Sequence, residues 1–283
     1  MCFAGASSVA TVSTTSASPP QRVGSSSSTL HGKIYLFSGR GGEAMAPVDE
    51  NGAVWVFDPS TVTWTLLSPA DPSKPFPPAR SYHCSASNGD DKIYIHAGCP
   101  ETGRLSDLWS FQPSSRTWLQ HADAPAPPRG GTSVAFQKGL LYRVNGFDGT
   151  TEQGGNLDVY DPTNNTWSSQ QYTADGVSGP TPRSVSALLP LVVDGKPSLV
   201  TLFGERDPSS LGHQGAGKML GDVWIYDIDS AAWSEVAAGA DAFNEPPPRG
   251  WFDADVVSQS EILVLGGLGE TNERLSDAWL LKF

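Results

Sequence analysis

The stretch Lys92-Ile93-Tyr94-Ile95-His96-Ala97-Gly98, followed by Asp107-Leu108-Trp109-Ser110-Phe111 and then by Trp118, decides the fold. A short apolar run that stops at glycine is typical of a buried central strand, and the run around Trp109 predicts a neighbouring strand. Turn residues before Trp118 predict a hairpin to a further strand. With an innermost strand after Arg80, this unit predicts one four-stranded antiparallel sheet.

The same order of features occurs five times in the chain. Each unit opens with a Pro-x-Arg or Pro-Arg step, at Arg22, Arg80, Arg129, Arg183 and Arg249. The runs that end at glycine span residues 33–39, 92–98, 140–146, 199–204 and 261–267. A fourth strand is expected from Trp64, Trp118, Trp167 and Trp233. Repetition at this length predicts an all-β propeller of about five four-stranded blades.

The last unit lacks one strand, because the chain ends at Phe283 without a fourth-strand tryptophan. We expect an N-terminal strand, drawn from Val9 to Ser13, to complete that sheet and cover its edge. The chain therefore divides into an N-terminal segment, residues 1–18, and a single propeller domain, residues 19–283.

Composition limits the classes of partner. The 283 residues carry 18 basic and 30 acidic side chains, a net charge of −12. A field of this sign repels a phosphate backbone or an anionic membrane, so neither nucleic acid nor membrane is an expected partner. Three cysteines without CxxC spacing predict neither a disulfide framework nor a thiolate zinc site. With no signal-peptide pattern, we expect a cytoplasmic protein.

Two groups of residues are candidates for chemistry. The repeated arginines, Arg80 and Arg129 among them, are expected near the channel mouth, where they either bond loop carbonyls or present paired N–H groups to an anion. The loop from Glu205 to Gly217 carries Glu205, Asp207 and His213, which are suitable ligands for Fe(II), Mn or Zn. The structural alternative is an Asx turn at Asp207, an ion pair of Glu205 and a packed His213.

The repeated glycines and tryptophans resemble kelch repeats over roughly residues 18 to 283. More specific stretches resemble the nitrile-specifier and thiocyanate-forming kelch proteins of plants and their fungal relatives. These stretches are Arg80-Ser81-Tyr82-His83, Gly98-Cys99, residues 103–109, Arg129-Gly130-Gly131, residues 145–149, residues 205–217, Arg249-Gly250-Trp251 and residues 272–277. The resemblance implies a kelch-type propeller, for which the family pattern is six blades.

The resemblance also implies a site. Fe(II) would be bound by Glu205, Asp207 and His213, Arg80 and Arg129 would hold a sulfate group, and His83 and Trp251 would shape the pocket. The family spaces its ligands Glu-x-x-x-Asp-x-x-x-His, whereas here Ser209 takes the middle position and Asp207 lies two residues earlier.

Three functions follow as hypotheses. The first is an Fe(II)-dependent specifier-type lyase or isomerase acting on a small anionic or sulfated metabolite. The second is a non-catalytic kelch scaffold that binds a protein or peptide partner. The third is a tailoring enzyme of fungal secondary metabolism that uses the same pocket. The fold alone does not choose among them.

Overall fold

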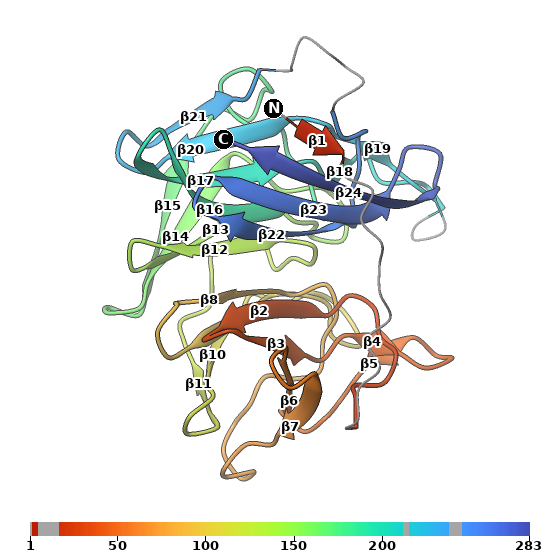
Figure 1. The fold of residues 1–283 in the computed structure, drawn as a ribbon, viewed down its shortest axis with the longest axis vertical. Coiled ribbons are helices and arrows are strands. Elements are labelled where there is room, and N and C mark those ends of the chain that lie inside the picture. The colour runs from red at the N-terminus through yellow and green to blue at the C-terminus, as the bar shows by residue number, and fades with distance from the viewer. Residues whose placement is uncertain (1, 5–16, 212–214, 238–244) are drawn as a thin grey trace.

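The structure, a computed structural model, describes residues 2–4, 17–211, 215–237 and 245–283. Its regular elements are β-strands, and they form five four-stranded sheets, the blades of a propeller (Figure 1). Within this described part, no helix has the length and hydropathy needed to cross a membrane. The all-β fold of about five blades predicted from the repeats is confirmed.

Each blade is named here by its strands in chain order. Blade 1 comprises β2 (Ser26–Leu30), β3 (Lys33–Phe37), β6 (Val54–Asp58) and β7 (Thr63–Leu67). Blade 2 comprises β8 (Cys84–Ser87), β9 (Ile93–His96), β10 (Leu108–Gln112) and β11 (Thr117–Gln120). Blade 3 comprises β12 (Ser133–Gln137), β13 (Leu140–Val144), β14 (Asn156–Asp161) and β15 (Thr166–Gln171).

Blade 4 comprises β16 (Ala187–Val193), β17 (Lys196–Leu202), β20 (Val223–Asp227) and β21 (Ala232–Glu235). Blade 5 comprises β22 (Asp253–Ser258), β23 (Glu261–Leu268), β24 (Arg274–Lys282) and β1 (Cys2–Ala4). Two short hairpins stand outside the blades. They pair β4 (Arg40–Gly41) with β5 (Ala46–Pro47) and β18 (Glu205–Arg206) with β19 (Lys218–Met219).

An N-terminal strand completes blade 5, as the missing fourth-strand tryptophan predicts. Strand β1 pairs antiparallel with β24, with Cys2 opposite Leu281 and Ala4 opposite Trp279. The chain therefore covers the outer edge of blade 5 with its own beginning, which removes a row of open backbone groups. The segment Val9 to Ser13, from which this strand was expected, lies outside the described residues.

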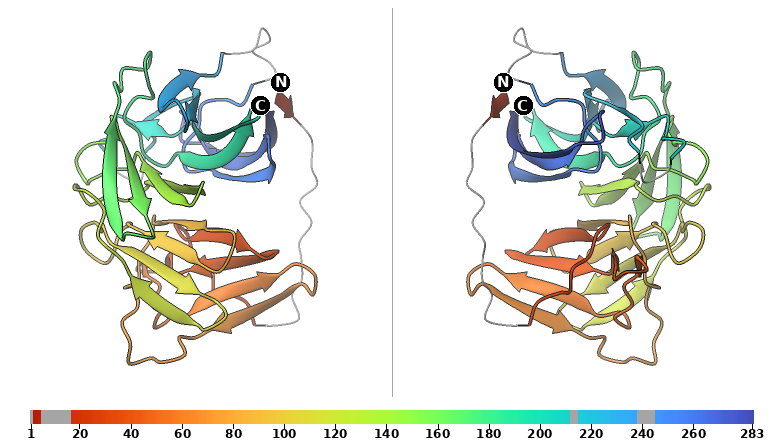
Figure 2. Two further views of the ribbon diagram at one scale, coloured as in Figure 1. Left: turned by 90° about the vertical axis from the view of Figure 1, so that its left-hand side faces the viewer. Right: turned by 90° about the vertical axis from the view of Figure 1, so that its right-hand side faces the viewer.

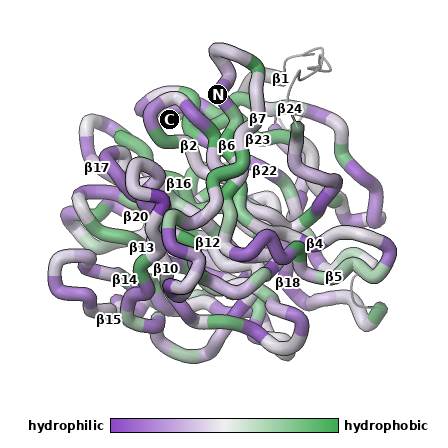
Figure 3. The backbone as a smooth tube through the Cα atoms, turned by 90° about the horizontal axis from the view of Figure 1, so that it is seen from below, coloured by the Kyte–Doolittle hydropathy of each residue, from purple (hydrophilic) through white to green (hydrophobic). Residues whose placement is uncertain are grey.

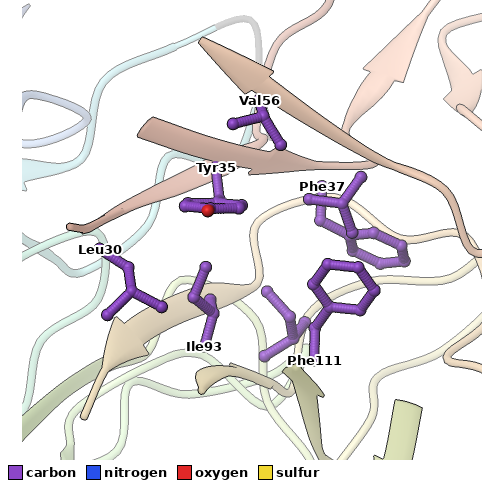
Figure 4. Close-up of a cluster of buried hydrophobic side chains, with 8 residues drawn as sticks. Leu30, Tyr35, Phe37, Val56, Ile93 and Phe111 are labelled. Atoms are coloured by element: carbon purple, nitrogen blue, oxygen red, sulfur yellow. The ribbon is translucent and has the colours of Figure 1, made fainter. Parts of the chain in front are cut away.

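The blades follow one another around a common axis (Figure 2). Their innermost strands pack in sequence, β2 against β8, β8 against β12, β12 against β16 and β16 against β22. Apolar side chains fill the space between the sheets; the cluster between blades 1 and 2 joins Tyr35 and Phe37 to Ile93 and Phe111 (Figure 4). Hydrophilic residues are common in the peripheral loops (Figure 3). The apolar clusters lie between the blades, so burial of the strand faces supplies the main stabilisation.

Four of the five repeated arginines form the frame of their own blades. Arg80, whose side chain is 0% exposed, donates to both carboxylate oxygens of Asp107 at 2.6 and 2.7 Å and to the Ala97 carbonyl at 3.0 Å. The Asp107 carboxylate also accepts a hydrogen bond from the indole of Trp109 at 2.8 Å. Equivalent pairs are Arg22 with Glu50, Arg183 with Asp222 and Arg249 with Asp277.

Each of these pairs ties the turn before the innermost strand to the third strand of the same blade. The arginine main chain then joins neighbouring blades, because its carbonyl accepts a hydrogen bond from the glycine amide that ends the second strand of the preceding blade. These bonds run from Gly39 to Arg80, Gly98 to Arg129, Gly146 to Arg183 and Gly204 to Arg249, at 2.8 to 2.9 Å. One residue per blade therefore connects its own sheet to the previous one.

Replacing Asp107 with alanine tests this frame. Asp107→Ala leaves the buried Arg80 guanidinium without its counter-charge, so we expect the free energy of unfolding to fall by about 3 kcal/mol in urea denaturation. Asp229→Ala is the matched control, because Asp229 pairs with Lys138 on the surface, where both side chains are about half exposed. The control should change stability by less than about 1 kcal/mol. Equal losses in the two variants would contradict the assignment.

Candidate functional site

One end of the propeller gathers a loop from every blade. In every blade, the residue directly after the glycine that ends the second strand forms a β-bridge with the residue that follows the repeated arginine. The bridges are Arg40 with Val23, Cys99 with Ser81, Phe147 with Gly130, Glu205 with Ser184 and Leu268 with Gly250. The hairpins β4–β5 and β18–β19 lie at this same end (Figure 1). We call these five loops the mouth.

One residue from each blade has a left-handed backbone conformation, and backbone hydrogen bonds link these residues from blade to blade at the mouth. The five residues have φ between 48° and 62°, and they are Gly24, Tyr82, Gly131, Val185 and Trp251. The amide of each donates to the carbonyl of the one before it: Tyr82 to Gly24 at 2.6 Å, Gly131 to Tyr82 and Val185 to Gly131 at 2.9 Å, and Trp251 to Val185 at 3.2 Å. Bulky residues in this conformation are held by the surrounding fold, which fixes where Tyr82 and Trp251 project.

Two aromatic side chains from different blades meet at the mouth. The rings of Tyr82 and Trp251 lie edge to face, with centroids 5.3 Å apart. The Trp251 indole donates to the Glu205 carboxylate at 2.8 Å, and the Arg40 guanidinium lies 5.7 Å from the centre of the Tyr82 ring. This arrangement confirms none of the predicted chemistry, but it brings two of the predicted site residues, Trp251 and Glu205, into direct contact.

Two arginines of the mouth carry charge that the protein does not neutralise directly. Arg40 and Arg104 are partly exposed, and within the described residues neither has a carboxylate oxygen within the 4.0 Å of an ion pair. The Nε atom of each is buried and has no hydrogen-bond partner. Arg104 lies over the ring of Phe147, 5.9 Å from its centre. Cys99 lies close to both charges, although burial raises the pKa of its thiol.

Carboxylates occupy the opposite part of the mouth. Glu205 is 6% exposed, and its other oxygen accepts the Gly217 amide at 2.5 Å. Glu152 follows the Phe147 loop; its Oε1 atom is buried without a hydrogen-bond partner. Burial first, and then the charges of Glu205 and Asp207, raise the pKa of the Glu152 carboxyl. Glu152 and Glu205 therefore place carboxylates on the loops of blades 3 and 4, beside the basic Arg206 and Lys218 of the β18–β19 hairpin.

The structure places Arg80 and Arg129 away from the exposed mouth. Arg80 is enclosed in the frame of blade 2, as described above. Arg129 is 4% exposed and donates to the carbonyls of Pro127 and Asn145. Blade 3 has Asn156 where blade 2 has Asp107, so Arg129 lacks the carboxylate partner of the other four arginines, and burial lowers its pKa to about 10. A role for either in holding an anion stays a prediction.

His83 packs between blades 1 and 2. Its imidazole is 5% exposed and lies 5.8 Å from the ring of Phe37. Burial, and then the nearby Arg80 charge, lower the pKa of His83 to about 3, so the ring is neutral at physiological pH. Its predicted role in shaping a pocket is not tested, but its contact with Phe37 is one of inter-blade packing.

The predicted metal ligands are only partly described. Glu205 is engaged by Trp251 and Gly217, and Asp207 is exposed, 3.4 Å from the Arg206 guanidinium. His213 lies outside the described residues. Among the residues whose positions are given, no group of three His, Cys, Asp or Glu side chains is placed to hold a metal ion. An Fe(II) site made by Glu205, Asp207 and His213 therefore stays a prediction.

Sequence reasoning overlooked Arg40 and Arg104. Arg104 lies within the stretch 103–109 that was named above only for its resemblance, and Arg40 directly follows the glycine that ends the run 33–39. For Arg40 a signal was available, because no other blade has an arginine directly after the glycine that ends its second strand. Arg104 does recur, since Arg274-Leu275-Ser276-Asp277 in blade 5 repeats Arg104-Leu105-Ser106-Asp107. Side chains that break a repeat are better candidates for function than those that maintain it.

The fold and the mouth define a five-bladed propeller built from kelch repeats, with its distinctive side chains on the loops of one face. Residues 4–204 match the family described as the KLHDC2/KLHL20/DRC7 Kelch-repeats domain, and the chain belongs to this family.

Several named proteins are similar to this chain at low identity. An F-box/kelch-repeat protein of Arabidopsis thaliana is 24% identical over 220 residues, which cover 74% of this chain and 43% of that protein. Acyl-CoA-binding domain-containing protein 4 of Arabidopsis thaliana is 27% identical over 210 residues, or 67% and 28% of the two chains. Multiple epidermal growth factor-like domains protein 8 of Mus musculus is 24% identical over 258 residues, or 87% and 9%. The chain spans less than half the length of each.

Metal content tests the iron site directly. If Glu205 and His213 bind Fe(II), protein purified anaerobically with Fe(II) should hold about one iron per chain, and Glu205→Ala and His213→Ala should each lose it. Elemental analysis measures the result, and Asp229→Ala, which changes a surface carboxylate of the β20–β21 turn that pairs with Lys138, should keep the metal. Metal-free wild-type protein would end the iron hypothesis.

Proposed function

We propose that the chain is a protein-interaction module whose mouth binds a peptide segment that carries an anionic group. The observation that carries the proposal is the pair of guanidinium groups of Arg40 and Arg104, which lack a carboxylate partner in the described structure. A guanidinium presents paired N–H donors in a plane, which matches a carboxylate or a phosphorylated side chain of a partner.

The aromatic rings beside these charges fit the same ligand. Tyr82 and Trp251 together offer a rigid apolar surface at the centre of the mouth, and such residues are common at the centres of protein interfaces. A peptide residue with an apolar side chain can pack against them while its neighbour reaches Arg40 or Arg104. Binding of peptides and partner proteins is also a common use of kelch propellers, which supports a scaffold more than an enzyme.

Charge gives the bound peptide a direction. Arg40 and Arg104 come from blades 1 and 2, whereas Glu152 and Glu205 come from blades 3 and 4. A segment that crosses the mouth with an acidic residue over Arg40 or Arg104 and a basic residue over Glu152 or Glu205 has complementary charge at those contacts. Because the whole chain carries a net charge of −12, its distant field opposes an acidic ligand, so affinity depends on direct contacts with the two arginines.

The specifier-type hypothesis uses part of the same surface. An Fe(II)-dependent lyase acting on a sulfated metabolite would need the loop of Glu205, and Arg40 and Arg104 would suit its anionic group as well as they suit a peptide. None of the relatives named above is named as a specifier protein, and one of them is named as a kelch-repeat protein. This activity, the tailoring reaction and the cytoplasmic location stay predictions.

Selection from a phage-displayed random peptide library tests the proposed function. Peptides enriched on the wild-type protein should share an acidic residue next to an apolar one. Arg40→Ala and Arg104→Ala should each weaken the selected peptides by about 10-fold or more in fluorescence polarisation, since each removes a charge-assisted hydrogen bond.

Arg116→Ala provides the matched control, because Arg116 is an exposed arginine in the outer hairpin of blade 2. It should leave peptide affinity unchanged. The proposal is wrong if the library yields no enriched peptides, or if the Arg116 variant loses as much affinity as the Arg40 and Arg104 variants.

A further inference from the structure

Between consecutive blades, the second strand presents alternate residues to the next blade. We call these two residues the forward pair. In blades 1 to 4 every member is at most 8% exposed. The pairs are Tyr35 and Phe37, Tyr94 and His96, Tyr142 and Val144, and Val200 and Leu202. Counting back from the terminal glycine, the forward pair of blade 5 is Leu263 and Leu265. These leucines are 40% and 50% exposed.

The face of blade 1 that points away from blade 2 is also exposed. The residues that alternate with the forward pair face the preceding blade, and we call them the backward pair. In blades 2 to 5 they are 0 to 3% exposed and are Ile93 and Ile95, Leu141 and Arg143, Leu199 and Thr201, and Ile262 and Val264. In blade 1 the backward pair is Ile34 and Leu36, and both are partly exposed.

No apolar cluster joins blade 5 to blade 1 among the residues with described positions. Four clusters are present, and they lie between blades 1 and 2, 2 and 3, 3 and 4, and 4 and 5. Figure 2 agrees, since the side of the ring between blade 5 and blade 1 holds no described strand. Burial of apolar surface holds the other blades together, so this interface lacks the main term that stabilises its four counterparts.

The backbone of blade 1 repeats the pattern. At four interfaces, the left-handed residue of one blade donates its amide to the preceding blade, and the arginine carbonyl accepts a glycine amide from that same blade. In blade 1 the corresponding groups are the Gly24 amide and the Arg22 carbonyl. In the described structure neither has a hydrogen-bond partner, although each is placed as its counterparts are.

We propose that the opening between blade 5 and blade 1 is a docking surface for one β-sheet blade of a partner protein. The chemistry required of this blade can be read from the four intact interfaces. It needs apolar residues on both faces, one pair for Leu263 and Leu265 and one for Ile34 and Leu36. It also needs a glycine amide for the Arg22 carbonyl and a free carbonyl for the Gly24 amide, as a kelch-type blade provides.

A second copy of this chain does not fit the opening as well. Each copy has one forward and one backward face at the two sides of its own opening. Joining both faces of two copies would require a single ring of ten blades, twice the five that one copy contributes. Joining one face would leave another open, so that further copies would keep adding. A single partner blade covers both faces at once and ends the assembly.

This surface is separate from the mouth. The forward pair of blade 5 and the backward pair of blade 1 lie on the faces of β23 and β3, whereas Arg40 lies in the hairpin β4–β5 and Arg104 in the loop between β9 and β10. Failure of peptide binding at the mouth would therefore leave the docking surface untouched, and the reverse also holds.

The experiment uses the second repeat of the chain as the probe. Residues 78–127 are added after Phe283 through a flexible linker, so that the full chain carries an extra blade with Ile93 and Ile95 on one face and Tyr94 and His96 on the other. We expect the melting temperature to rise by about 5 °C or more. Hydroxyl-radical oxidation of Leu263 and Leu265, read by mass spectrometry, should be rapid in the natural chain and fall several-fold in the extended one.

Leu119 is the internal control, because it is 56% exposed on β11 of the original blade 2 and should be oxidised equally in both proteins. The extended chain with Leu263→Asp and Leu265→Asp should lose the gain in melting temperature, whereas Leu119→Asp should keep it. Slow oxidation of Leu263 and Leu265 in the natural chain would show that the ring closes on itself and would overturn the proposal. An unchanged melting temperature on extension would overturn it as well.

Discussion

The buried pairing of an arginine with a carboxylate is the constraint on which the structure depends. A guanidinium enclosed by protein is stable only when its charge and N–H groups are matched, and Asp107 does this for Arg80. The pair holds the third strand against the turn before the innermost one, and the arginine carbonyl takes an amide from the preceding blade. The same small set of atoms therefore organises each sheet and its place in the ring.

This constraint decides which arginines are available for binding. Four of the five arginines that recur in the repeats pair with a carboxylate of their own blade. Arg129 lacks such a partner, because blade 3 carries Asn156 at the position of Asp107. The chemistry of the mouth then depends on side chains outside this frame, namely Arg40, Arg104 and Glu205. A rigid scaffold with variable loops is a general way to place binding groups, and here the left-handed chain through Tyr82 and Trp251 supplies the rigidity.

Strand prediction succeeded because each strand has a local signal. The run Ile93 to Gly98 and the tryptophans at 64, 118, 167 and 233 mark strands that begin within a residue of the expected positions. Blade closure was predicted from the absent tryptophan after residue 279 and is confirmed by β1. The choice of Arg80 as a ligand group had no such support, because the carboxylate that occupies it lies 27 residues further along the chain.

The sequence by itself determined the all-β class, the five blades and their strand order, because apolar alternation, glycine stops and turn residues act over a few neighbouring positions. Only the tertiary structure decided which charges are satisfied and which faces are covered. Nothing in the sequence next to Arg80 or Arg40 shows whether its charge is satisfied, yet one is enclosed beside Asp107 and the other is partly exposed over Tyr82. The same holds for Val264 and Leu265, neighbours on β23, since a strand turns successive side chains to opposite faces and only one of those faces meets another blade.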